Sequence, residues 1–425
     1  MKVRFYNGRV LTMEEGRPIF EGEVRVSGNR IVYVGLSEQA PEGEIFDREI
    51  DLKGNLIMPG FKNAHTHSGM TFARSLADDL PLHEWLNNMI FPMEAKLTPE
   101  QIYHLSKLAI LEYLTSGITA NFDMYLTPET VAQASVDMGF RTVMVGAVNN
   151  FSQSLAQLED WYVKYRDYHE LITFCLGFHA EYTTSRELLE GVAALAQKYQ
   201  APVYTHNSET ASEVEGCMER YGMTPTQLFD SLGIYDFGGG GYHCVYMTEE
   251  DLAIFKRREL SVVTNPASNL KLASGIAPIG QMMSTGVNVA IGTDGPSSNN
   301  CLDMFREMFL VTALAKYREQ NAAACDAEAV LRMATVGGAK AMGLTDCDVL
   351  AEGKLADLIV IDLKQPNMQP INHIEKNLVY SGSKQNVKLT MVNGRILYED
   401  GAFFVGEDPE AIYAKANEIV AQIRG

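Results

Sequence analysis

The middle of this chain alternates short apolar runs with helical patterns, and this alternation restricts the possible folds more than any other feature. The apolar runs predict buried strands, and the stretches between them, such as residues 99–116 and 186–199, predict helices. Strands that alternate with helices in this way pair in parallel. The strands are expected at residues 56–61, 118–123, 141–148, 172–178, 201–206, 239–243, 261–265 and 287–293.

Eight such strands predict an α/β fold, a TIM-like (β/α)₈ barrel over residues 56–348. A doubly wound open sheet is the competing arrangement, and it binds phosphate at a glycine-rich turn after an early strand. No glycine-rich phosphate fingerprint follows any early strand of this sequence. The barrel is therefore the expected architecture.

Both ends of the chain have the pattern of a small antiparallel sheet. β-rich runs lie between turn pairs, and the Asn7-Gly8-Arg9 turn near the start is echoed by Asn393-Gly394-Arg395 near the end. The two ends are therefore expected to build one domain. The predicted domains are a composite β-sandwich of residues 1–55 and 349–405, the barrel of residues 56–348 and a C-terminal helix of residues 406–425.

Composition and charge narrow the class of protein. A hydrophobic fraction of 46% and a charged fraction of 21% are typical of a globular protein in water, and the net charge of -19 argues against nucleic acid or an anionic membrane as partner. The six cysteines form no C-x-x-C, which favours a reducing compartment. The N-terminus lacks the apolar core of a signal peptide and no run is long enough to span a membrane, so we expect a cytoplasmic protein.

Metal-binding side chains lie at the ends of several predicted strands. His65 and His67 close the first strand and, being two positions apart, point to the same face. The fifth strand ends in His206, the sixth in His243 and the eighth in Asp294. A single histidine at a strand end is usually a polar cap. Because barrel active sites form where the strands end, we expect these five side chains to converge.

Three nitrogens and one oxygen suit an open catalytic metal site that leaves a position for water. The expected ligands are His65, His67, His206 and Asp294. Zinc and ferrous iron both accept this set, and zinc is the expected ion. Glu209, three residues after His206, and His243 have natural roles as proton carriers beside the metal.

These motifs resemble the amidohydrolase superfamily. The resemblance is carried by Pro59-Gly60-Phe61 with His65-Thr66-His67, by Thr205-His206 with Glu209, by His243-Cys244 and by Gly292-Thr293-Asp294-Gly295. The flanking stretches 75–85, 268–275 and 352–360 resemble its branch of 5′-methylthioadenosine/S-adenosylhomocysteine deaminases and related ring deaminases and chlorohydrolases.

The resemblance implies the hydrolytic deamination of an adenosine-like aminopurine with release of ammonia. Asp294 would take a proton from the attacking water, His243 would hold and polarise that water, and Glu209 would protonate the ring nitrogen. Members with two metals use a carboxylated lysine on the fourth strand. The fourth strand expected here, residues 172–178, contains no lysine, which supports one metal ion.

The resemblance also implies which residues contact the substrate. Trp85 matches an apolar wall, Glu94 a partner of the ribose hydroxyls and His179, after the fourth strand, a further contact. The loop of residues 68–97 is long enough to fold over the pocket as a lid. A homo-oligomer is expected by analogy with the family.

Two departures keep the substrate open. Many nucleoside-specific relatives carry an arginine near the position of Gly146 and another in the next loop, whereas residues 144–155 contain none. Thr264 also stands where relatives often have histidine. The alternatives are deamination of guanine, a pterin or a pyrimidine, and hydrolysis of a C–Cl or amide bond at the same metal site. A non-catalytic barrel would be expected to lose metal ligands, and all four candidates are present.

Overall fold

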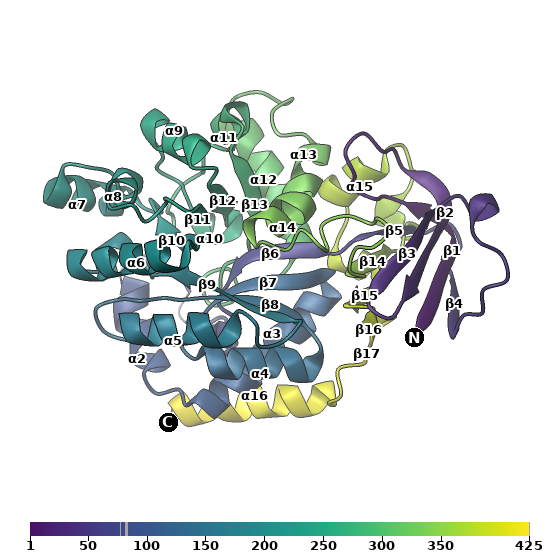
Figure 1. Cartoon of the computed structure of the whole chain (residues 1–425), viewed down its shortest axis with the longest axis horizontal. Coiled ribbons are helices and arrows are strands. Elements are labelled where there is room, and N and C mark those ends of the chain that lie inside the picture. The colour runs from purple at the N-terminus through teal and green to yellow at the C-terminus, as the bar shows by residue number, and fades with distance from the viewer. Residues whose placement is uncertain (77, 81–83, 425) are drawn as a thin grey trace.

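A computed structural model of the chain describes residues 1–76, 78–80 and 84–424. Within these residues, one sheet contains eight strands in chain order, each parallel to its neighbour, and helices lie around it (Figure 1). This arrangement confirms the predicted barrel. Its strands are β6 (Phe61–Thr66), β7 (Ile118–Met124), β8 (Arg141–Val145), β9 (Ile172–Gly177), β10 (Val203–Asn207), β11 (Gly239–His243), β12 (Ser261–Thr264) and β13 (Asn288–Ile291).

Capping side chains determine where several of the outer helices begin. Thr98 and Gln101 cap each other's backbone at the start of α3, and Pro99 occupies its first turn. The longer helices are α3 (Pro99–Thr115), α4 (Pro128–Met138), α5 (Leu155–Tyr165), α6 (Arg186–Tyr199), α7 (Ala211–Tyr221), α9 (Glu249–Arg257), α12 (Met304–Arg318) and α16 (Pro409–Arg424). The shorter ones are α2 (Phe91–Glu94), α8 (Pro225–Ser231), α10 (Pro266–Lys271), α11 (Ile279–Thr285), α13 (Ala327–Arg332), α14 (Gly338–Ala341) and α15 (Ile374–Tyr380).

The two chain ends form a second, mixed sheet beside the barrel (Figure 1). The domain predicted as a β-sandwich is hydrogen-bonded, in the described part of the chain, as one nine-stranded sheet in the order β17-β16-β15-β14-β5-β1-β2-β3, with β4 on β1. The predicted division at residues 55, 348 and 405 stays a prediction. The strands are β1 (Lys2–Val10), β2 (Phe20–Ser27), β3 (Arg30–Gly35), β4 (Arg48–Asp51), β5 (Leu56–Pro59), β14 (Leu358–Ile361), β15 (Val387–Val392), β16 (Arg395–Glu399) and β17 (Ala402–Phe403).

The strand expected at residues 56–61 is in fact two strands in two different sheets. β5 pairs with β14 and β1, whereas β6 begins at Phe61 and pairs with β7. The backbone N–H of Gly60 donates to Asp357 O (3.1 Å), and that of Phe61 donates to Gly117 O (2.9 Å). A Cβ at Gly60 would lie 2.1 Å from the Thr119 side chain, so only glycine fits where the chain changes sheets.

The first and last barrel strands meet through residues of β6 and the residues that follow β13. The backbone N–H of Asp294 donates to His65 O (3.0 Å). The amide of Asn63 accepts from the Thr293 N–H (2.9 Å) and donates to its hydroxyl (2.8 Å). This contact holds the end of β13 against β6 and brings Asp294 to the histidines of the first strand.

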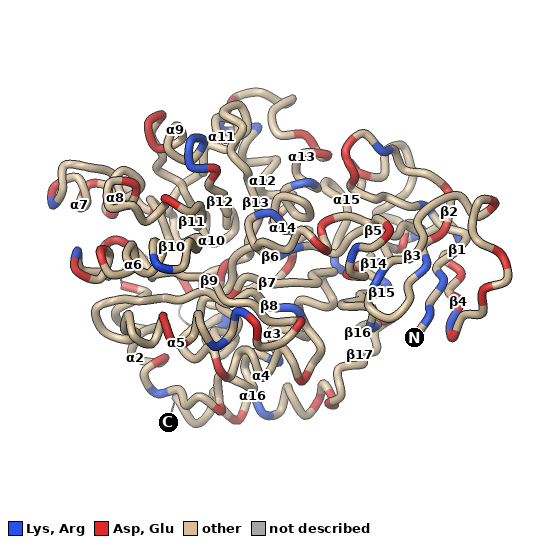
Figure 2. The backbone as a smooth tube through the Cα atoms, in the orientation of Figure 1, with Lys and Arg blue, Asp and Glu red and all other residues tan. Residues whose placement is uncertain are grey.

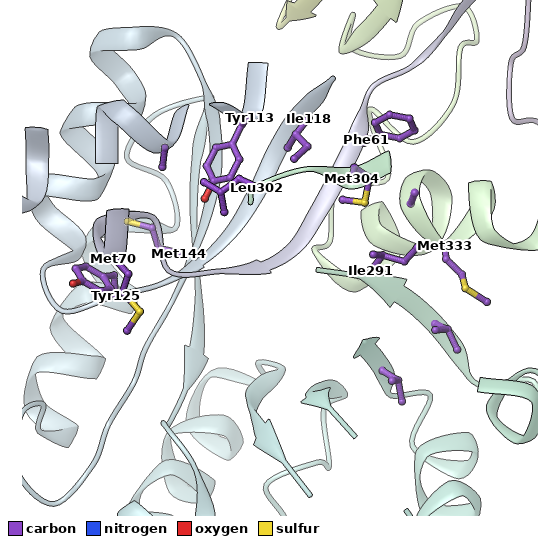
Figure 3. Packing of buried hydrophobic residues seen from close by; sticks show 14 of the residues in the cluster. Phe61, Met70, Tyr113, Ile118, Tyr125, Met144, Ile291, Leu302, Met304 and Met333 are labelled. Atoms are coloured by element: carbon purple, nitrogen blue, oxygen red, sulfur yellow. The ribbon is translucent and has the colours of Figure 1, made fainter. Parts of the chain in front are cut away.

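Buried contacts join the barrel to the terminal sheet. Arg141, at the start of β8, makes two hydrogen bonds to Asp357, of 2.7 and 3.0 Å, and both side chains are buried. The apolar core continues around the barrel strands in Figure 3, where Phe61, Ile118 and Ile291 lie among other buried side chains. The last helix, α16, packs on α3. No helix in the described ranges is both long and apolar enough to cross a membrane.

Candidate active site and metal centre

Side chains from four strand ends converge at one end of the barrel, as the sequence predicted. One potential ligand atom from each of His65, His206, His243 and Asp294 lies within 4.8 Å of the others. His67 adjoins this group, with Nε2 3.2 Å from Asp294 Oδ1. This group of four therefore contains His243, which was expected to hold a water molecule. His67, which was expected as a ligand, is not one of the four and contacts the group at Asp294.

Three of the histidine rings are oriented by acceptors on their outer side. A carbonyl oxygen only accepts, so the Nδ1 atom that meets it carries the proton, and the lone pair of Nε2 is left for the centre of the site. Histidines that bind metals are commonly held in this way. The contacts join Nδ1 of His67 to Met124 O (2.5 Å), of His206 to His179 O (2.7 Å) and of His243 to Asn269 Oδ1 (2.7 Å).

His65 provides the test of whether a cation fits. Both of its ring nitrogens are buried, and neither has a hydrogen-bond partner among the described residues. The ring stacks on Tyr242 at 3.8 Å, and Nε2 lies 3.4 Å from Asp294 Oδ1. Burial lowers the pKa of His65 to about 3, so the imidazole is neutral and offers a lone pair. Unsatisfied buried nitrogens are rare, and this donor set fits a divalent cation.

The two oxygens of the Asp294 carboxylate have different surroundings. Oδ2 accepts hydrogen bonds from the hydroxyls of Ser268 (2.6 Å) and Ser298 (2.7 Å). Oδ1 faces His65 and His67. Burial alone would raise the pKa of Asp294, but the close approach of these two imidazoles holds it well below its usual range. The ionised carboxylate therefore presents one oxygen to the centre.

The backbone is also unusual at the site. Asp294 has a φ of 58° and His243 a φ of 68°, in the left-handed region that residues other than glycine seldom adopt. Such conformations cost about 1–3 kcal/mol each and concentrate at functional sites.

Glu209 lies next to this group and is shielded from solvent. Its Oε2 is 3.7 Å from Nε2 of His243, and its Oε1 accepts a hydrogen bond from the Ser274 hydroxyl (3.2 Å). The carboxylate of Glu213 fixes the backbone, because it accepts from the N–H of Glu209 (2.7 Å). Burial raises the pKa of Glu209, which favours the protonated carboxyl.

A cavity of about 360 Å³ opens onto these residues. The segment expected as a lid forms one wall, through its described residues Met70, Trp85 and Glu94; positions 77 and 81–83 of that segment lie outside the described residues. Trp85 and Glu94 are only 5% and 7% exposed. Even so, Trp85 Nε1 and Glu94 Oε1 have no hydrogen-bond partner among the described residues. The wall thus offers one donor and one acceptor to a polar ligand.

His179 also lines the cavity, and its Nδ1 contacts the Thr183 hydroxyl at 2.8 Å. Sequence reasoning missed the residues that orient the site, which are Met124, Ser268, Asn269, Ser274 and Ser298, and the lining residues Phe91, Phe151 and Tyr182. Ser268 and Asn269 do lie in a stretch that carried the resemblance, directly after the seventh strand. Their position after a barrel strand was the signal that could have identified them.

Comparison with known proteins places the chain among enzymes. The model of the amidohydrolase family matches residues 56–397. A 5-methylthioadenosine/S-adenosylhomocysteine deaminase of Moorella thermoacetica is 41% identical over 409 residues, which cover 95% of each chain. The crystal structure of an adenosine deaminase from Xanthomonas campestris with bound zinc is similar over 99% of this chain and 98% of that one, with a TM-score of 0.94 and 33% identity.

A zinc complex of the atrazine chlorohydrolase from Arthrobacter aurescens has a TM-score of 0.90. It covers 98% of this chain and 100% of that one, at 23% identity. At this identity the likeness is one of fold.

Proposed function

Because this chain belongs to the amidohydrolase family, we propose that it is a metal-dependent hydrolase that deaminates an adenosine-like aminopurine, such as 5′-methylthioadenosine, S-adenosylhomocysteine or adenosine. The observation that carries the proposal is the buried Glu209 carboxyl, which lines one cavity together with an ionised aspartate and the imidazoles of His67, His206 and His243. The deaminase names of relatives at about 40% identity support the choice of reaction.

We assign one divalent cation to His65, His67, His206 and Asp294, with zinc as the ion and ferrous iron as the alternative. The neutral, partnerless His65 imidazole and the oriented rings of His67 and His206 support this assignment. When bound, such a cation lowers the pKa of a water molecule from near 16 to about 7 and so supplies a nucleophile at neutral pH.

Three side chains move protons or orient the attacking water. Asp294 Oδ1 accepts a proton from the attacking water, while the two serine hydroxyls hold Oδ2. His243 orients the water through Nε2, because Asn269 holds its Nδ1. Glu209 delivers a proton to the ring nitrogen next to the carbon under attack, so that the ring accepts the added electron pair. The amine then takes the proton held by Asp294 and leaves as ammonia, while the new hydroxyl group returns a proton to Glu209.

The cavity wall holds the nucleoside. Glu94 Oε1 accepts from ribose hydroxyls, Trp85 supplies a flat apolar surface, and His179 is a further contact. We place the reaction in the cytoplasm, where the six free cysteines would remain reduced. Association into a homo-oligomer remains a prediction.

The direct test is ammonia release by the purified, zinc-loaded chain. We expect 5′-methylthioadenosine or adenosine to yield one ammonia per purine, measured by a coupled assay, and guanine and cytosine to yield none. Release of chloride from a chlorotriazine, or of acid from a ring amide, without ammonia from any nucleoside would contradict the proposal and favour another hydrolase.

A further inference from the structure

We propose that the cavity selects nucleosides whose 5′ substituent is uncharged, and discriminates against a 5′ substituent that carries an amino-acid carboxylate. Adenosine and 5′-methylthioadenosine belong to the first class, and S-adenosylhomocysteine belongs to the second. This inference rests on the proposed deaminase function and narrows its substrate class.

The charges around the cavity are the first argument. The described lining residues include three carboxyl groups, those of Glu94, Glu209 and Asp294, and no Lys or Arg. Positions 77 and 81–83 hold no Lys or Arg in the sequence either. A substrate carboxylate that entered this part of the cavity would lose water and gain no lysine or arginine partner, which is unfavourable.

Cations near the cavity wall are engaged elsewhere. Lys96, which follows the lining residue Ala95, donates to Ile423 O (3.1 Å). Lys271 precedes the lining residue Leu272, and its Nζ lies 2.5 Å from Asp78 Oδ1. Arg220 is distant from the wall in sequence and pairs at 2.5 Å with Glu181, the residue that precedes the lining residue Tyr182. Over the whole molecule, most charged residues lie on the outer helices, loops and terminal sheet rather than on the barrel strands (Figure 2).

The loop after β8 is the second argument, because it forms part of the cavity wall. The side chain of Asn149 lines the cavity, but its polar atoms are engaged within the loop. Its Oδ1 accepts from the N–H groups of Phe151 (2.9 Å) and Ser152 (2.8 Å). Its Nδ2 donates to Ala147 O (2.9 Å) and to the Ser152 hydroxyl (2.7 Å). The amide that could have met a carboxylate is therefore used to hold the turn.

An apolar surface stands beside this turn. The rings of Phe91 and Phe151 are 5.3 Å apart, and Phe91 is 6.3 Å from the His179 ring. Leu86 and Leu126 line the same cavity. Aromatic and aliphatic groups of this kind pack well against a thioether, whose sulfur is polarisable. The wall therefore suits a methylthio or alkylthio group better than an ionised one.

The test compares kcat/KM for three 5′-thioethers of adenosine with the zinc-loaded chain. S-Adenosylhomocysteine and 5′-butylthioadenosine have substituents of similar length, and the second has no charge, so the pair separates charge from size. We expect 5′-methylthioadenosine and the butylthio compound to react with similar efficiency, and S-adenosylhomocysteine to be at least ~10-fold poorer, because its carboxylate finds no partner.

A variant that adds a cation to the cavity wall tests the same inference in the opposite direction. Phe151 is 60% exposed, so Phe151→Arg adds a cation without disturbing the core. We expect this variant to raise the efficiency ratio of S-adenosylhomocysteine to butylthioadenosine by about 10-fold, through a charge-assisted hydrogen bond. Phe151→Leu removes the ring without adding charge and should leave the ratio unchanged.

Equal efficiency of the butylthio and homocysteine compounds would overturn the inference, as would equally poor turnover of both, since size would then be the cause. An unchanged ratio in Phe151→Arg would also overturn it. These results leave the deaminase proposal intact, because ammonia is still released from 5′-methylthioadenosine. Absence of ammonia from all three compounds and from adenosine would instead remove the proposed function itself.

Discussion

His67→Ala is expected to lose bound metal and turnover together, whereas His243→Ala is expected to keep the metal and lose only turnover. Both imidazoles have Nδ1 fixed by an acceptor, Met124 O for His67 and Asn269 Oδ1 for His243. The proposed roles differ, because His67 would bind the cation and His243 would orient water. Mutation of a residue that only supports a metal ligand weakens metal binding by up to ~10²-fold. Loss of a direct ligand should therefore weaken metal binding by at least ~10²-fold.

The measurement is zinc content per chain after dialysis against a weak chelator, together with kcat on the same samples. Circular dichroism and thermal unfolding show whether each variant is folded. The reverse pattern, with metal retained in His67→Ala and lost in His243→Ala, would contradict the assignment. His243 would then be the ligand, in agreement with the compact group of His65, His206, His243 and Asp294.

Glu209→Gln is expected to keep zinc and lower kcat by at least ~10², because glutamine preserves the shape of the side chain but cannot deliver a proton. Glu209 is not one of the proposed ligands, and neither is His243, whose Nε2 its Oε2 approaches to 3.7 Å, so the metal should be retained. Glu215→Gln is a matched control on the following helix, where the side chain is exposed, and it should leave kcat and zinc content unchanged.

The pH profile gives an independent reading of the same residue. Burial raises the pKa of Glu209, so the carboxyl stays protonated to higher pH than a carboxyl in water. Since the proposed step needs the protonated form, kcat of the unaltered chain should fall as the pH rises through this pKa. The residual rate of Glu209→Gln should lack that fall. Near-normal turnover of the variant, or an unchanged alkaline limb, would remove Glu209 from its role.

The barrel could be predicted from sequence because parallel strands require helical crossovers, and the resulting alternation is visible along the chain. The first strand was the exception. Residues 56–61 form one uninterrupted apolar run, and the change of sheet at Gly60 depends on its bond to Asp357, about 300 residues away. Hydrophobicity has no signal for such a change, because both strands are buried.

The convergence of the site could likewise be predicted, because side chains at the carboxyl ends of barrel strands share one rim. The contacts that orient these side chains could not be predicted. A backbone carbonyl such as Met124 O has no sequence signature, and the hydroxyls of Ser268 and Ser298 reach Asp294 from two different loops. The sequence also could not decide between His67 and His243, since spacing along the chain does not give distances to a common centre.

The central claim is that one cation lies where the rings of His65, His67 and His206 meet the Asp294 carboxylate. Anomalous diffraction at the zinc edge, from crystals of the zinc-loaded chain, measures this directly. We predict a single peak per chain, about 2.0–2.2 Å from three imidazole nitrogens and one carboxylate oxygen of these residues. Absence of a peak at this position, or a pair of peaks bridged by other residues, would contradict the account.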